Sequence, residues 1–170
     1  MNQAVIEWLN ALPTEPAHEQ MRKCCGAEWW INRMIAERPF SDAHETADRV
    51  FDAMPSDAWL EAFACHPKIG DLESLRMKFS GNKQWSAGEQ AGVAETDERT
   101  LVRLAEGNEA YLERFGYIFI VCASGKSAAE MLALLEARLG NAPDDELPIA
   151  AVEQRKITHL RLDKLTIEEG

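Results

Sequence analysis

The chain has 170 residues, of which 46% are hydrophobic and 28% are charged. This length favours one domain with an ordinary core, over residues 1–170, and the apolar fraction excludes a disordered or collagen-like protein. Eighteen lysine and arginine residues face 29 acidic residues, so the net charge is −11. Because such a surface repels phosphate backbones and anionic lipid, we expect neither nucleic acid nor a membrane as a partner. A small anionic ligand stays open, since it needs only a few local cations.

Several features predict a cytoplasmic location. The longest apolar run covers residues 117–123, well short of the ~18–20 residues that span a bilayer. The N-terminal segment has no basic stretch and meets Glu7 early, which is not typical of a signal peptide. The four cysteines form no CxxC pair, which favours reduced thiols. The C-terminal Glu168-Glu169-Gly170 differs from a peroxisomal address.

The first half of the chain shows apolar residues at helical spacing between stop signals. One helix is predicted over residues 2–11 and ends at Pro13. A second helical region is predicted over residues 17–37, and Gly26 is the point at which it can break in two. Two more helices are predicted after candidate N-terminal caps, at Asp42 with Glu45 and at Ser56.

The second half predicts three longer helices. They cover residues 97–115, the stretch from the cap at Ser127 to residue 139, and the stretch from residue 144 or 145 to residue 165. Only residues 117–123 have the composition of a strand, and a single strand cannot form a sheet. The sequence therefore predicts an all-α fold, a single compact multi-helix domain of seven or eight helices.

Two familiar kinds of site find little support. Gly125-Lys126-Ser127 opens a helix, but a phosphate-binding loop needs a glycine where this chain has Ile120. A turn and a helix cap explain these residues, and the loop could still present N–H groups to a non-nucleotide anion. A catalytic pair of His66 with Cys65 or Cys122 is conceivable, although cysteine is more often a small buried hydrophobe. No metal is expected, because no ligand spacing links the histidines at positions 18, 44, 66 and 159.

The segment CHPKIGD at residues 65–71 is the most informative one. It sets His66 at a predicted helix end, before the rigid Pro67 and a turn at Gly70. A histidine held in this way, with its ring exposed, suits acid/base work near neutral pH. On composition alone, a histidine that is hydrogen-bonded within the protein or merely exposed, without a catalytic role, is the more common case.

A second cluster, WSAGEQAG at residues 85–92, follows a polar stretch at 80–86 that predicts a mobile surface loop. Ser86 and Glu89 form first of all a capping box. With Gln90 and the small residues around them, they also leave an open helix N-terminus that can bind a polar heterocycle.

A third candidate is Arg161, which lies near the predicted buried face of the last helix. An inward-facing arginine needs a carboxylate partner, which either the protein or a ligand can supply. A structural ion pair is the more common outcome.

Taken in order, four segments resemble one family. They are HPKIGD at 66–71, WSAGEQAGV at 85–93, NEAYLERFGYIFIVCASGKS at 108–127 and EQRKITHLRLDKL at 153–165. Together they resemble 2-oxo-4-hydroxy-4-carboxy-5-ureidoimidazoline (OHCU) decarboxylase, the last enzyme of the route from urate to allantoin. The resemblance covers essentially the whole chain. It implies an all-α, cofactor-free and commonly homodimeric enzyme with OHCU as substrate and (S)-allantoin as product.

The resemblance also implies the residues of the site. The family's proton-donating histidine falls on His66, and Glu89 is the second catalytic residue. The implied substrate-binding residues are Pro67, Ser86, Gln90, Phe119, Ile120, Val121, Cys122, Ala123 and Arg161. Lys68 departs from the family, which usually has arginine there. Lysine keeps the positive charge but cannot form a bidentate pair, so the difference affects pairing at that position and not the expected reaction.

The chemistry that the resemblance implies needs no metal, pyridoxal or thiamine. CO2 leaves a carbon that bears a hydroxyl and adjoins an imine, and the imine accepts the electron pair. The intermediate is then protonated on one face to give (S)-allantoin. We expect His66 to manage that proton, Glu89 to hydrogen-bond the hydroxyl and ring nitrogens, and Arg161 to hold a carboxylate or carbonyl.

Two other classes of function stay open. One is a non-catalytic helical module that binds a ureide, or a partner protein on its acidic face. The other is a different cofactor-free acid/base enzyme that acts on another ureide or a hydantoin. Replacing Glu89 separates them, because a binding module has affinity but no turnover to lose.

Overall fold

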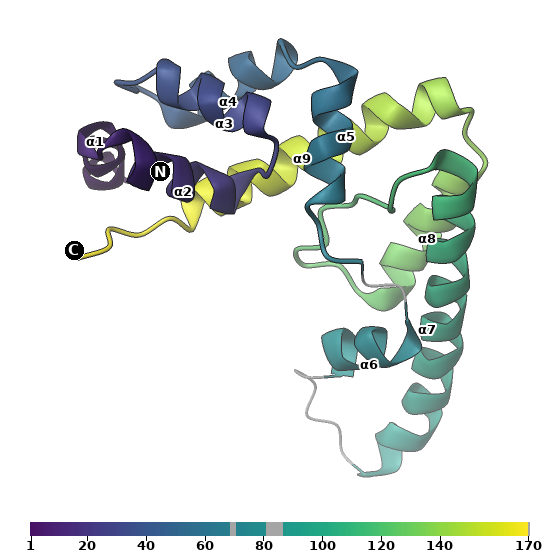
Figure 1. The fold of residues 1–170 in the computed structure, drawn as a ribbon. Coiled ribbons are helices and arrows are strands. Elements are labelled where there is room, and N and C mark those ends of the chain that lie inside the picture. The colour runs from purple at the N-terminus through teal and green to yellow at the C-terminus, as the bar shows by residue number, and fades with distance from the viewer. Residues whose placement is uncertain (69–70, 81–86, 170) are drawn as a thin grey trace. The chain divides into compact units, whose positions relative to one another are not determined.

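The computed structural model describes the backbone of residues 1–68, 71–80 and 87–169, and their side chains except those of residues 80 and 87–97. Within these ranges it contains nine helices and no strand (Figure 1). The all-α prediction is therefore confirmed, and the number of helices exceeds the predicted seven or eight. No helix in the described ranges is both long and apolar enough to cross a bilayer.

The chain divides into two compact units. Unit 1 comprises residues 1–66 and 151–170, and unit 2 comprises residues 67–150. Helix α9 (Pro143–Asp163) begins in unit 2 and continues in unit 1. The single domain expected over residues 1–170 stays a prediction.

Unit 1 is built from short helices that follow the predicted stop signals. The region expected over residues 17–37 is two helices that separate around Gly26, as anticipated. A side chain at Gly26 would collide with that of Cys65, so the glycine lets this turn approach the end of a later helix. Besides part of α9, unit 1 contains α1 (Gln3–Ala11), α2 (Thr14–Cys24), α3 (Glu28–Ala36), α4 (Ala43–Asp52) and α5 (Ser56–Ala64).

The core of unit 1 lies around α3. Trp30 and Phe63 are fully buried, and so are Ile31 and Met34. Helix α3 packs against α2, α4 and α5. This packing fixes the C-terminal end of α5, where the histidine motif begins.

The caps in unit 1 agree with the sequence in one case and differ in the other. Asp42 caps α4, because its carboxylate accepts the N–H groups of His44 and Glu45 at 2.9 and 3.1 Å. The expectation for Ser56 is wrong. Pro55 occupies the cap position of α5 without a side-chain hydrogen bond, and Ser56 is the first helical residue.

Unit 2 contains α6 (Leu72–Ser80), α7 (Ala87–Phe115) and α8 (Ala128–Leu139). Helix α7 packs along α8 and also against α6 (Figure 1). Its contact with α8 is close at Gly107, where a side chain would collide with Leu135. Ser127 caps α8 as predicted, because its hydroxyl accepts the N–H of Glu130 at 3.2 Å.

The apolar segment at residues 117–123 is an irregular connection between α7 and α8 and not the strand that its composition suggests. Gly116 and Gly125 stand on either side of it, with φ angles of +82° and +73°. Glycine adopts this left-handed conformation without steric cost. The two turns let the segment run back over the core of unit 2, where Ile120 and Cys122 are buried.

Candidate functional site

His66 follows the C-terminal end of α5 and is half-buried in unit 1. Its backbone N–H donates to the Phe63 carbonyl at 3.2 Å, which continues the last turn. Its Nε2 lies 2.5 Å from Oε1 of Gln154 on α9. Because an amide oxygen only accepts, Nε2 is the donor, and Nδ1 is left as the acceptor of the neutral ring.

The amide of Gln154 is held at its other end by Thr158. Its Nε2 donates to the Thr158 hydroxyl at 3.1 Å, and both side chains are buried. Residues 154, 158 and 161 lie on one face of α9, since they are four and then three positions apart. Sequence reasoning missed Gln154 and Thr158, although their spacing from Arg161 was a usable signal.

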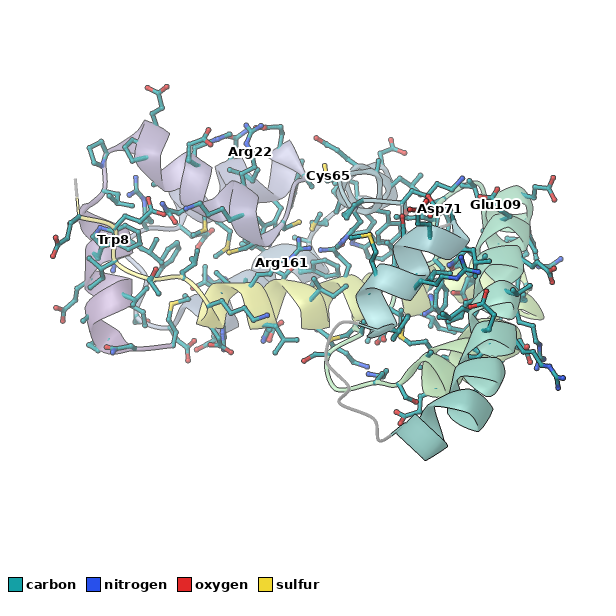
Figure 2. All side chains as sticks on the ribbon, turned by 90° about the horizontal axis from the view of Figure 1, so that it is seen from below. Trp8, Arg22, Cys65, Asp71, Glu109 and Arg161 are labelled. Atoms are coloured by element: carbon teal, nitrogen blue, oxygen red, sulfur yellow. The ribbon has the colours of Figure 1, made fainter. Side chains whose placement is uncertain are left out.

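Arg161 is a half-buried cation on this face of α9 (Figure 2). Its guanidinium makes no hydrogen bond or ion pair with any residue that the structure describes. It lies close enough to His66, Cys24 and Cys25 to affect the pKa values of all three. The structural ion pair that is common for such an arginine is therefore not found within the described residues, and a ligand carboxylate suits the position.

The pKa of His66 is lowered from its ordinary value of 6.5. Burial is the largest cause, and the positive charge of Arg161 adds to it, whereas the hydrogen bond to Gln154 raises the pKa. His66 is therefore neutral near pH 7. Its imidazolium, when formed, is a stronger acid than that of an ordinary histidine.

The cysteines near this face are poor nucleophiles. Burial raises the pKa of Cys24 to about 12 and that of Cys25 to about 11, so both are thiols at neutral pH. The Cys65 thiol is exposed and donates to the Gly26 carbonyl at 3.5 Å. No cluster of three or more His, Cys, Asp or Glu side chains suited to a metal occurs in the described part of the chain.

The predicted substrate-binding segment at 119–123 belongs to unit 2. Arg138 donates to the Ile120 carbonyl at 2.6 Å, and Lys126 donates to the Cys122 carbonyl at 2.7 Å. Ile120 and Cys122 are buried, whereas Phe119, Val121 and Ala123 are only partly covered. These contacts hold the carbonyl groups of alternate residues of the segment in place.

A buried ionic network holds Arg138 in turn. Its Nε donates to Oε1 of Glu146 at 2.6 Å, and Asn141 donates to Oε2 of the same carboxylate at 2.9 Å. Glu146 has no exposed surface, and Arg138 is 7% exposed. Sequence reasoning missed this pair because neither residue belongs to a motif that it singled out.

The remaining predicted site residues stand as follows. Pro67 is exposed at the start of unit 2, and Lys68 forms an ion pair with Glu109 at 2.7 Å. Both Glu109 and Asp71 appear in Figure 2 among the side chains of unit 2. Residues 81–86 of the loop expected at 80–86 lie outside the described residues, and Ser86 is one of them. The side chains of Glu89 and Gln90 also lie outside them, although their backbone is in α7. That His66 and Arg161 share one site with these residues of unit 2 stays a prediction.

Comparisons relate this chain to known proteins. The family model described as OHCU decarboxylase matches residues 10–163. The chain is 39% identical over 154 residues to the uric acid degradation bifunctional protein TTL of Arabidopsis thaliana, which covers 89% of this chain and 48% of that protein. The chain thus spans about half the length of that relative.

Two further matches cover most of this chain and most of the matched protein. The 2-oxo-4-hydroxy-4-carboxy-5-ureidoimidazoline decarboxylase of Amia calva is 34% identical over 133 residues, or 75% of this chain and 74% of that protein. A crystal structure of OHCU decarboxylase in the presence of (S)-allantoin matches with a TM-score of 0.68 and 38% identity. That match covers 86% of this chain and 96% of the other.

Proposed function

The chain belongs to the OHCU decarboxylase family, and from this membership we infer that it is a carboxy-lyase that converts OHCU to (S)-allantoin in urate degradation. One observation carries the proposal from family to chemistry. On one face of unit 1 lie a neutral His66, whose Nδ1 has no hydrogen-bond partner among the described residues, and the cation of Arg161, which has no acidic partner among them. This pair suits an anionic substrate that must exchange a proton.

The reaction breaks the bond between the carboxylate carbon and the ring carbon that bears the hydroxyl. CO2 leaves, and the electron pair moves toward the adjacent imine, whose nitrogen takes up a proton. The substrate thus supplies its own electron sink, so the proposal needs no cofactor. The intermediate then loses its hydroxyl proton and gains one at the neighbouring carbon, which gives allantoin.

In this proposal, His66 transfers the proton that the carbon gains in the second step. Its neutral ring takes up a proton at Nδ1 and passes it to carbon. The lowered pKa favours this transfer, because it makes the imidazolium a better donor. Glu89 hydrogen-bonds the hydroxyl and ring nitrogens and assists the collapse of the hydroxyl to a carbonyl.

The other proposed residues orient the substrate. Arg161 holds the carboxylate or a carbonyl, for which its planar guanidinium is well suited. Ser86, Gln90, Pro67 and the segment at 119–123 orient the ring and the ureido group. We further propose that the protein acts in the cytoplasm as a homodimer, as the resemblance implies.

The proposal is tested by following OHCU as it is generated in situ from urate by upstream enzymes. We expect the protein to accelerate OHCU loss well beyond the spontaneous decay. Glu89→Gln should abolish most of that acceleration, whereas in a binding module it would change only affinity. Loss of another ureide or hydantoin, without loss of OHCU, would favour the alternative enzyme.

A further inference from the structure

We propose that Gln154 is a positioning residue that fixes which nitrogen of His66 carries the proton. The catalytic consequence rests on the proposed function, because only a reaction makes use of the free Nδ1. The hydrogen-bonded state of the ring itself does not depend on that function.

The geometry of the amide supports this role. Gln154 has no exposed surface, and it turns its oxygen to His66 at 2.5 Å and its nitrogen to Thr158 at 3.1 Å. The Thr158 side chain also lies close enough to the Cys25 thiol, after the end of α2, to lower the pKa of that thiol. The amide is thus held at both ends. Turning it over would set its NH2 group against the N–H of the ring and break the favourable pair.

The charge of this environment explains why an amide suits the position. Among the described residues, the groups that act on the pKa of His66 are the guanidinium of Arg161 and the amide of Gln154, both from α9. A carboxylate in place of the amide would stabilise the imidazolium and would pair with Arg161. A neutral acceptor instead holds the Nε2 proton and leaves the ring uncharged, so Nδ1 stays available as a base.

The test is a 15N NMR titration of the histidines in the whole chain, with His66→Gln used to assign the His66 signals. In the wild type we expect a neutral ring protonated at Nε2, with a midpoint below 6.5. Gln154→Glu should raise that midpoint by roughly 1–3 units, because an opposite charge then contacts the ring. The signals of His18, His44 and His159 serve as internal references in the same spectra.

A second pair of variants covers the case in which the buried glutamate prevents folding. Thr158→Val removes the oxygen that anchors the amide, whereas Thr158→Ser keeps it. We expect the valine variant to lose the strong preference for the Nε2 proton, and the serine variant to restore it. Unchanged His66 signals in folded Gln154→Glu and in Thr158→Val would overturn the proposal.

Kinetics supply the catalytic readout. Gln154→Leu should lower kcat roughly 10- to 100-fold, by analogy with the loss of a partner that orients a metal-binding histidine. The acid limb of kcat/KM should move to higher pH in Gln154→Glu. If the NMR shifts appear in a protein that does not accelerate OHCU loss, the proposed function fails and the role of Gln154 stands. If the activity is present and the shifts are absent, the role of Gln154 fails.

Discussion

The Tyr111 hydroxyl donates to Oε1 of Glu146 at 2.6 Å, although the two residues are 35 positions apart. Neither side chain has any exposed surface. Burial raises the pKa of Tyr111, and the hydrogen bond to Glu146 adds to this rise. With Arg138 and Asn141, the tyrosine completes the set of donors to a buried carboxylate that ties α7 and α8 to the first turn of α9.

Removing the tyrosine hydroxyl should destabilise the protein. Tyr111→Phe leaves the carboxylate of Glu146 with one donor fewer, and we expect the free energy of unfolding to fall by about 1–3 kcal/mol. Urea denaturation measures this change. Glu113→Gln, an exposed substitution on the same helix, is the matched control and should stay within about 0.5 kcal/mol of the wild type. Equal stability of Tyr111→Phe and the wild type would contradict the assignment.

Breaking the ion pair itself should cost more. Arg138→Leu leaves the Glu146 charge buried without its main partner, and we expect a loss of about 3–5 kcal/mol. Arg138→Lys should recover part of it, because it keeps the charge and loses the fork geometry. Replacing both residues by leucine should be less harmful than Arg138→Leu alone. A double-mutant cycle that shows no coupling between Arg138 and Glu146 in the free energy of unfolding would contradict a stabilising ion pair.

The local part of the fold could be predicted from the sequence. Asp42 and Ser127 act as the caps that their spacing to Glu45 and Glu130 indicated, and Pro13 and Gly26 end helices where expected. Helix α6 was missed. The helix predicted over residues 97–115 begins ten residues earlier, at Ala87, next to the capping-box pattern of Ser86 and Glu89. Asp71 gives the start of α6, since it accepts the Ser74 N–H at 2.6 Å, whereas glycines at 88 and 92 lower the apparent helix propensity of α7.

The site could be predicted only where a motif marks it. His66 and Arg161 were singled out, and the structure sets both in unit 1. Gln154 was missed because buried glutamine is uncommon and its partner His66 lies 88 positions away. Arg138 was missed because it belongs to no motif that was singled out, and only the folded chain shows that it holds the Ile120 carbonyl.

Removal of the His66 ring should slow the reaction strongly without unfolding the protein. His66→Ala should lower the enzyme-dependent rate by ~10²–10⁴-fold, the usual contribution of an acid/base residue. The measured rate must be corrected for the spontaneous decay of OHCU, which is the lowest rate that the assay can show. Turnover near that of the wild type would remove His66 from its proposed role.

Loss of the Arg161 charge should affect binding and acidity together. Arg161→Gln should raise KM, because the substrate carboxylate loses its cation. It should also raise the pKa of His66, since the Arg161 charge lowers that pKa, so the acid limb of kcat/KM moves to higher pH. Stability should not fall, because the guanidinium has no partner among the described side chains. Arg161→Lys is the control that keeps the charge, and an unshifted pH profile in Arg161→Gln would argue against the contact.

The most direct test of the central claim is the chirality of the product. Circular dichroism should be recorded while upstream enzymes generate OHCU from urate, with and without this protein. We predict a rapid rise of the (S)-allantoin signal that appears only when the protein is present, and that Glu89→Gln and His66→Ala suppress. A slow, optically silent drift to racemic allantoin, at the same rate with and without the protein, would contradict the assignment of this chain as a decarboxylase.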